Sequence, residues 1–174
     1  MTQPNTAAGL QWKWSQPEAF KRIHQMTRGD EVAATLSFGG MCGSLATAES
    51  AHGRWTFKRG GFLSPRVTVR KAGETNDLAV FYPKWQGGGE LRFTAGETYT
   101  LKSLNFWGGD WAFENQRGEI VVSLHGPHGF LKSAGEIEVG AASDHADVTL
   151  LAILGWYLRL LMLEDAAATA VIIS

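Results

Sequence analysis

The chain has little of what would cross-link a small fold or direct it out of the cell. Cys42 is the only cysteine among 174 residues. This excludes an intrachain disulfide framework and any zinc site built from several cysteines, and it favours a reducing compartment. Residues 1–5 show neither the basic segment nor the apolar run of a secretory signal. From these two absences we expect a cytoplasmic protein.

Neither sign of charge is in excess. The chain carries 16 basic and 17 acidic residues, a net charge of −1, so total charge predicts no attraction to nucleic acid or to a membrane. No nucleic-acid partner is expected, and any attraction to an anionic surface has to be local. A chain that is 44% apolar and 19% charged is neither disordered nor fibrous, and this length suits one domain with its own core.

Apolar side chains recur at every second position over residues 31–140, which is typical of strands with one buried face. Glycine-containing turns, such as those at 39–40 and 108–109, separate the runs. We count about eleven strands here and a twelfth if residues 20–26 are extended, which is near the number at which an open sheet closes or splits. We therefore predict a mainly β fold with an antiparallel sheet, either a sandwich or a closed barrel of about twelve strands. In the clearest run, residues 31–38, one face carries Val32, Ala34, Leu36 and Phe38.

The segment 20–26 permits two interpretations. Ser15, Pro17 and Glu18 have the character of a helix start, and Phe20, Ile23 and Met26 follow at helical spacing. The alternating set is equally typical of a strand, and it consists of Phe20, Arg22, His24 and Met26. Both interpretations stay open.

The pattern changes after residue 142. Ser143 or Asp144 is suited to cap a helix, and residues 148–163 contain only two clearly polar side chains, Thr149 and Arg159. A helix that is apolar on every side has to be buried on every side. We therefore predict a helix that passes through the interior of the barrel. Because an unpaired buried charge is costly, Arg159 has either to find a carboxylate partner inside or to emerge at the barrel mouth, and emergence is the simpler expectation.

We expect one domain, with its parts in chain order. An N-terminal segment precedes the barrel, and an apolar tail follows the helix; the predicted bounds are 1–14, 15–142, 143–165 and 166–174. A C-terminal membrane anchor is the alternative for the last two parts. The fully apolar run 150–158 is shorter than the roughly 20 residues of a membrane span, and three charged residues oppose lengthening it: Arg159, Glu164 and Asp165.

Four stretches carry a family resemblance: residues 43–49 (GSLATAE), 55–59 (WTFKR), 66–70 (RVTVR) and 154–158 (LGWYL). Together with the order of elements over nearly the whole chain, they resemble the superfamily of tubby C-terminal domains, phospholipid scramblases and LURP-one-related proteins. The resemblance implies a closed barrel around a hydrophobic central helix, and a binding scaffold, since tubby domains hold phosphoinositide head groups through basic side chains. The chain has no cysteine cluster and no recognisable acidic calcium loop. Calcium-dependent scrambling is therefore not expected, and the LURP-one-like members are the closest comparison.

Charge is unevenly placed along the chain. Residues 51–102 carry nine basic and four acidic side chains, a local net charge of +5, whereas residues 103–174 carry three and nine, a local net charge of −6. If residues 53–59 and 65–71 pair as a hairpin, four cations share the face opposite the apolar side chains. Such a face suits a phosphorylated head group. A solvated face relieved by nearby acids is the alternative. The candidate ligand-binding residues are Arg54, Lys58, Arg66, Arg70 and, from the next segment, Lys84.

Other constellations are weaker. Trp85, Trp107 and Trp111 lie beside glycine-rich turns and allow carbohydrate platforms, although aromatic residues in strands more commonly fill a core. His125 and His128 flank one turn, and His145 with Asp147 offers further metal ligands, but spacing fixes no third ligand. Cys42 is expected to be a small, partly buried thiol rather than a nucleophile.

No motif nominates a reaction, a cofactor or a metal. The function we expect is a non-enzymatic binding module that recognises an anionic ligand, such as a phospholipid head group at a membrane surface, through the basic hairpin. A protein-interaction or structural module without a small-molecule ligand is the alternative, and a metal-dependent enzyme is the third. The protein is expected to be cytoplasmic and peripheral to the membrane.

Overall fold

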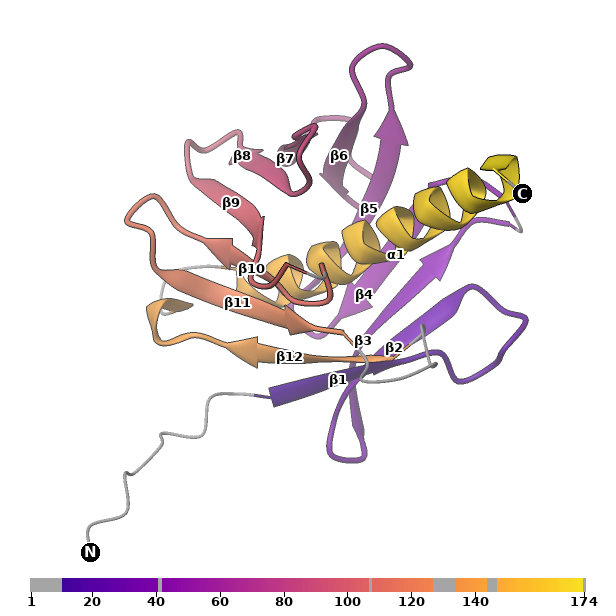
Figure 1. The fold of residues 1–174 in the computed structure, drawn as a ribbon. Helices are drawn as coiled ribbons and strands as arrows, with labels where there is room; N and C mark the ends of the chain where they lie inside the picture. Colours follow the sequence, from indigo (N-terminus) through magenta and orange to yellow (C-terminus); the bar gives the residue numbers. More distant parts are fainter. Residues whose placement is uncertain (1–10, 41, 107, 127–133, 144–146, 174) are drawn as a thin grey trace, which may run out of the picture.

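Twelve strands close into one barrel in the computed structural model, which describes residues 11–40, 42–106, 108–126, 134–143 and 147–173 (Figure 1). Each strand pairs antiparallel with its neighbour in the chain, and β12 pairs with β1 to close the ring. The predicted mainly β barrel is confirmed. Its strands are β1 (Gln11–Ser15), β2 (Ile23–Arg28), β3 (Glu31–Phe38), β4 (Ala46–Ser50), β5 (Gly53–Gly60), β6 (Arg66–Lys71), β7 (Ala79–Pro83), β8 (Gly89–Phe93), β9 (Thr98–Ser103), β10 (Trp111–Glu114), β11 (Ile120–His125) and β12 (Gly135–Val139).

The barrel begins earlier in the chain than the sequence pattern indicates. Trp12 and Trp14 alternate with exposed residues in β1 and point into the core, so the barrel starts at Gln11 rather than at residue 15. The strand interpretation is right for residues 23–26, which belong to β2 with His24 and Met26 buried, whereas Phe20 lies exposed in the β1–β2 loop. Ten strands rather than about eleven lie between residues 31 and 140, and β1 with β2 complete the twelve.

One residue of the clearest predicted strand points the wrong way. Val32 is half exposed, although Ala34, Leu36 and Phe38 on the same predicted face are buried. The cause is a register shift in the β2–β3 pair: Met26 lies opposite Ala34, but Thr27 lies opposite Val32. The extra residue of such a bulge reverses the alternation beyond it.

A single helix fills the barrel. After a short turn of 3-10 helix, η1 (Ala141–Ser143), the helix α1 (Val148–Ile173) runs through the ring of strands (Figure 1). All side chains of α1 from Leu150 to Leu158 are buried, which confirms the predicted central helix. Asp147 Oδ1 accepts a hydrogen bond from Leu150 N at 3.2 Å and thereby caps the first turn.

The bounds of the helix differ from the prediction at both ends. It starts at Val148, not at residue 143, and it continues through the stretch predicted as a separate tail. Asp144 lies outside the described residues, and Ser143 belongs to η1. Among the described residues, no helix is both long and apolar enough to cross a membrane.

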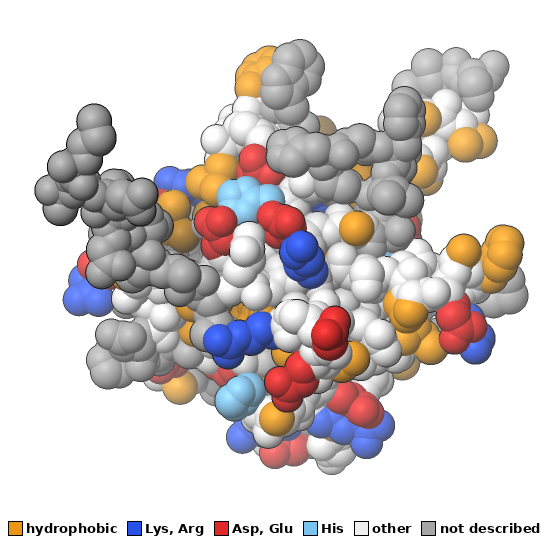
Figure 2. All heavy atoms as spheres, turned by 90° about the horizontal axis from the view of Figure 1, so that it is seen from below, with side chains coloured by type: hydrophobic (Ala, Val, Ile, Leu, Met, Phe, Trp, Pro, Cys, Tyr) orange, Lys and Arg blue, Asp and Glu red, His pale blue; other side chains and the backbone are white. Residues whose placement is uncertain are grey.

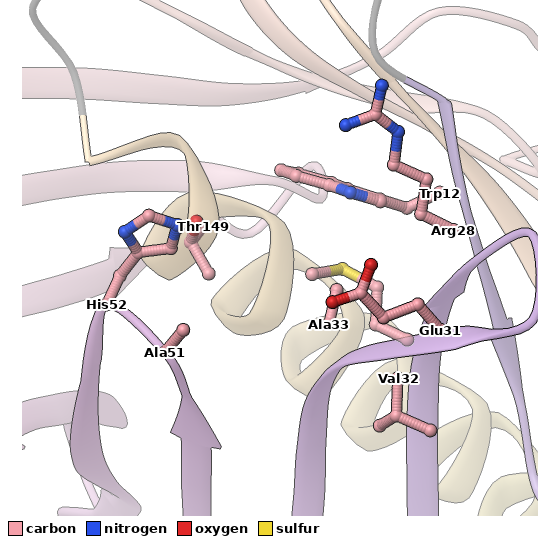
Figure 3. A pocket seen from close by; sticks show the side chains of 9 residues that line it. Trp12, Arg28, Glu31, Val32, Ala33, Ala51, His52 and Thr149 are labelled. Carbon is pink, nitrogen blue, oxygen red and sulfur yellow. The ribbon is translucent and has the colours of Figure 1, made fainter.

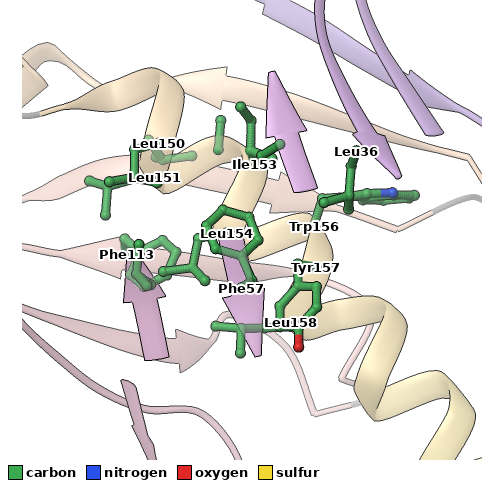
Figure 4. Packing of buried hydrophobic residues seen from close by; sticks show 14 of the residues in the cluster. Leu36, Phe57, Phe113, Leu150, Leu151, Ile153, Leu154, Trp156, Tyr157 and Leu158 are labelled. Carbon is green, nitrogen blue, oxygen red and sulfur yellow. The ribbon is translucent and has the colours of Figure 1, made fainter. Parts of the chain in front are cut away.

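Aromatic rings join the helix to the wall (Figure 4). Trp156 stacks on Trp14 of β1, with ring centroids 5.7 Å apart and an interplanar angle of 2°. The Tyr157 ring stacks on that of Phe38, with centroids 5.7 Å apart, and its centroid lies 5.3 Å from that of Phe57. Such pairs contribute about 0.5–1.5 kcal/mol each beyond the apolar area they bury. The Tyr157 hydroxyl also donates to Ser44 O at 2.6 Å, which anchors the helix to the β3–β4 loop.

The barrel has two different ends because consecutive strands alternate in direction. The β1–β2, β3–β4, β5–β6, β7–β8 and β9–β10 loops share one end with the last turns of α1, and we call it the exit end. Arg22 and Arg59 bond there to Glu164 and Asp165 of α1. The loops that follow the even-numbered strands surround the first turn of α1 at the opposite end, which we call the entry end. Thr149 lines a pocket there with residues of β2, β3 and the β4–β5 turn.

Close approach of helix and wall predicts a matched pair of glycine variants. A Cβ on Gly135 of β12 would lie 2.5 Å from Trp156 Cζ3 and 2.9 Å from His125 O, whereas a Cβ on Gly60 of β5 would have no atom within 4 Å. Gly135→Ala should lower the free energy of unfolding in urea by about 1–3 kcal/mol through overpacking. Gly60→Ala should change it by less than about 0.5 kcal/mol. Equal stabilities of the two variants would contradict this packing.

Candidate functional site

The β5–β6 hairpin presents its cations outward. Phe57 lies opposite Val69 in the register and both are buried, so their sequence neighbours point to the outside. The structure therefore places Arg54, Lys58, Arg66 and Arg70 on one outer face, as the pattern predicts. What the sequence does not reveal is which of these cations are already engaged.

Two of the four cations hold a carboxylate. Arg54 Nη2 lies 2.7 Å from Glu49 Oε1 of β4, and Arg70 Nε lies 2.7 Å from Asp77 Oδ1 of the β6–β7 loop. Both pairs are largely exposed, so each contributes about 0–1 kcal/mol to stability. Their consequence is electrostatic, because each carboxylate offsets the charge of its arginine. Within the described part of the chain, Lys58 and Arg66 have no ion-pair partner.

The face extends over the next two strands. Lys84 follows β7, is exposed, and has no ion-pair partner among the described residues. Arg92 projects from β8 over the Tyr82 ring, 5.1 Å from its centroid, and bonds to Glu90. Sequence reasoning missed Arg92, although the alternation of Leu91 and Phe93 signals its outward direction. We call the outer face of β5–β8 the basic wall, with Arg54, Lys58, Arg66, Arg70, Lys84 and Arg92.

The opposite side of the barrel has no such bias. Figure 2 views the molecule from below Figure 1, where β1 and β12 lie, and acidic and basic side chains are interspersed over that face. His125 lies between two carboxylates there: its Nδ1 is 3.5 Å from Asp110 Oδ1, and its Nε2 is 3.6 Å from Glu138 Oε2. The face seen in Figure 2 therefore does not share the positive bias of the basic wall.

A small apolar pocket opens where the basic wall meets the helix. It has a volume of about 170 Å³ and lies between α1 and the exit-end halves of β6 and β7. Phe81, Leu158 and Met162 line it, together with the charged residues Arg59, Arg66 and Asp165. Arg59 is bonded to Asp165 at 2.7 Å, so Arg66 is the cation with its charge available. A cation beside an apolar recess matches the chemistry of an amphiphile.

A second pocket, of about 250 Å³, lies at the entry end (Figure 3). Arg28 and Trp12 line one side of it, and His52 and Thr149 face them from the other, with Glu31 between. Its residues come from distant parts of the chain, so no sequence pattern identifies it. No hydrogen bond joins these polar side chains to one another within the described structure, so the pocket holds no base already paired with a nucleophile.

The metal and aromatic candidates are placed only in part. His128, His145 and Trp107 lie outside the described residues. Within the described ranges, no three His, Cys, Asp or Glu side chains form a group that could hold a metal ion. Trp85 is fully exposed, whereas Trp111 is half-buried and donates from Nε1 to Gly108 O at 2.9 Å. The expectation of a partly buried thiol is wrong, because Cys42 is exposed.

Arg159 is buried, which corrects the prediction that it emerges into solvent. Only 9% of its surface is exposed, and Nη1 donates to Gly109 O of the β9–β10 loop at 2.5 Å. Burial lowers the pKa of Arg159, and the nearby charge of Asp110 acts in the opposite direction. The β9–β10 loop thus contacts the guanidinium. Because Gly109 and Arg159 are fifty residues apart, no local sequence pattern predicts this contact.

His24 is the other buried ionisable group of the interior. Its ring lies between Phe38 and Trp156, with centroid distances of 6.3 Å to each, and its Nδ1 has no hydrogen-bond partner. Burial, aided by the charge of Arg22, lowers the pKa of His24 to about 4. The histidine is therefore a neutral core residue at physiological pH.

The class of protein that this geometry defines is a closed antiparallel barrel around its own C-terminal helix, with one basic wall. No family model, curated protein or solved structure matches the chain.

The buried His24 predicts acid sensitivity. The pKa of its imidazole is about 4 in the folded chain, against an ordinary value of 6.5 for an exposed histidine, so the unfolded chain binds the extra proton between these limits. Stability is full above pH 6.5 and falls as the pH drops toward 4, by about 3 kcal/mol from this residue. Urea unfolding from pH 7 to pH 4 should show a shallower decline in His24→Leu than in the wild type. Identical slopes would refute the assignment.

Proposed function

We propose that this chain is a non-enzymatic binding module that recognises the head groups of an anionic phospholipid surface through Lys58, Arg66 and Lys84. The observation that carries the proposal is that these three cations of the basic wall lack an ion-pair partner among the described residues. In this proposal the protein is cytoplasmic and peripheral to the membrane.

The spacing of the cations supports phosphate recognition. Gly60 lies opposite Arg66 in the β5–β6 register, so Lys58 is a diagonal neighbour of Arg66, at a separation of about 7–8 Å. Arg66 offers a planar fork for two phosphate oxygens and Lys58 a compact point charge. Arg54, Arg70 and Arg92 extend the positive potential, with their charges partly offset by acids.

The neighbouring pocket favours a lipid over a free anion. Arg66 lines a recess with the apolar side chains of Phe81, Leu158 and Met162. With about 170 Å³ it is smaller than the roughly 300–1,000 Å³ of ordinary ligand sites. It suits a few methylene groups next to a head group, whereas a free phosphate would leave the apolar part unused.

The resemblance to tubby-like and LURP-one-related proteins is part of the same proposal. A barrel closed around a hydrophobic C-terminal helix is the arrangement that the resemblance implies, and basic side chains hold the head groups in tubby domains. A shared architecture alone does not imply a shared function, so the basic wall has to carry the argument.

Removing Lys58, Arg66 and Lys84 together should weaken capture by anionic vesicles. Each cation near such a surface contributes about 1 kcal/mol, so Lys58→Ala/Arg66→Ala/Lys84→Ala should bind roughly 100-fold more weakly. The matched control is Lys13→Ala/Arg28→Ala/Lys71→Ala, which removes two lysines and one arginine that also lack ion-pair partners within the described ranges and are not members of the basic wall. The measurement is co-sedimentation with neutral and anionic liposomes at low and near-physiological salt.

The outcomes of this comparison are distinct. Capture by anionic vesicles alone, weakened by salt and lost only in the basic-wall variant, supports the head-group site. Equal losses in both variants overturn the site while leaving a general charge effect. Absence of capture overturns the lipid function and leaves a protein-interaction module as the better interpretation.

Releasing a paired arginine should strengthen binding. Asp77→Asn keeps the size of the side chain but removes the charge held by Arg70, so affinity for anionic vesicles should rise by about fivefold, the effect of one further available cation. Glu119→Gln is the control, because Glu119 forms a comparable exposed pair with Arg117, at 2.9 Å, beyond β10. A gain of equal size in both variants would show that only net charge matters.

A further inference from the structure

The exposed apolar side chains of the described chain gather at the exit end. Val32 and Ile120 are the exceptions at the entry end among the large ones. Tyr82 lies near the exit end of β7. All the others lie either in the loops of the exit end or in the last turns of α1. We call the loop and helix set the apolar rim, and its members are Phe20, Leu45, Phe62, Leu63, Trp85, Leu104, Phe106, Val171 and Ile172.

Four members of the rim are almost completely exposed. Phe20, Phe62, Leu63 and Trp85 have relative exposures of 101%, 100%, 91% and 103%. Turn residues are ordinarily glycine, proline or small polar residues, so large apolar residues at these tips serve no turn geometry. Water is an unfavourable environment for each of them, and burial in an apolar medium would be favourable.

Two of these loops are structured. Gly61 has a φ of +85° and precedes Phe62, and the turn that carries Trp85 is closed by Lys84 N to Gly88 O and Gly87 N to Lys84 O, both at 3.0 Å. In Figure 1 the β5–β6 hairpin extends beyond the ring of strands. The apolar tips are therefore held out by the fold, which reduces the entropy lost when they enter another phase.

The arrangement of the tips fits a lipid surface better than a protein surface. Protein interfaces have a closely packed apolar core, whereas these side chains stand apart on separate loops. Aromatic and leucine side chains next to cations are typical of segments that enter a membrane interface. Here Lys84 is adjacent to Trp85, and Arg66 begins the strand after Phe62 and Leu63.

The two acids of α1 at the exit end, Glu164 and Asp165, do not oppose such contact. Glu164 lies 2.5 Å from Arg22 Nη2, and Asp165 lies 2.7 Å from Arg59 Nη1. Each negative charge that α1 carries as it leaves the barrel is thus offset by an arginine of the wall. The helix then continues with exposed apolar residues, including Ile172.

We infer that the exit end enters the interfacial layer of an anionic bilayer, with the apolar rim among the acyl chains and Arg66 and Lys84 at the level of the head groups. This inference rests on the proposed function and adds the orientation of the molecule. The barrel axis points toward the membrane, the entry end faces the solvent, and the rim enters by about 5–10 Å.

An environment-sensitive label tests the orientation. In a Cys42→Ser background, Leu63→Cys places a single thiol on the rim and Ala95→Cys places one on the exposed β8–β9 turn at the entry end. Each variant carries nitrobenzoxadiazole and is mixed with anionic vesicles, with or without a bilayer-embedded quencher. We expect several-fold brighter, blue-shifted and quenchable emission from position 63 and none of these changes from position 95.

Substitution of the rim gives an independent readout. Phe62→Ser/Leu63→Ser/Trp85→Ser should weaken capture at least tenfold, also at high salt, where charge is screened. Val32→Ser/Ile120→Ser, which changes the two large exposed apolar residues of the entry end, should weaken it less than twofold. Because Phe62, Leu63 and Trp85 are almost completely exposed, urea unfolding of the rim variant should show the wild-type stability.

The results separate the two ideas. Capture that depends on the basic wall, with identical emission from positions 63 and 95, overturns insertion and leaves the proposed function standing. Absence of capture in the wild type overturns both and points to a protein partner for the rim. Loss of capture in the rim variant together with a shift only at position 63 supports the orientation.

Discussion

The constraint on which the rest of the structure depends is the helix α1, which is apolar all round and has to be buried all round. Twelve antiparallel strands provide a closed surface for it, and a ring of aromatic side chains fills the space between. The stacked pair of Trp14 and Trp156 joins one of the first residues of the barrel to its last element. Where helix and wall come closest, glycine is required, as at Gly135. The Trp14–Trp156 stack thus joins parts of the chain that are more than a hundred residues apart.

The direction of the helix makes the two ends of the barrel different. Asp147 caps the helix at the entry end, and Arg22 and Arg59 bond to the acids with which it leaves the exit end. The loops around the exit end carry the large exposed apolar side chains, and the basic wall reaches the same end through Arg66 and Lys84. Apolar tips and available cations therefore lie together, which is the combination that an anionic lipid surface would meet.

Net charge is a poor guide to this molecule. Although the net charge is −1, the basic wall carries six cations. Three of them form ion pairs with carboxylates. Short ion pairs between neighbouring strands and loops decide which charges are available to a ligand. The number of basic residues in a stretch of sequence is therefore only an upper limit on the number of cations available to bind an anionic partner.

The sequence by itself determined the fold class, the central helix and the outward direction of the hairpin cations. Each follows from a local pattern: apolar residues alternate in the strands, and they cover every side of the helix. Only the tertiary structure decided where the barrel starts, which cations are paired, that Arg159 is covered, and that Phe20, Phe62 and Trp85 share one end. Those outcomes depend on strand register and on ring closure, which bring distant residues together and leave no local pattern in the sequence.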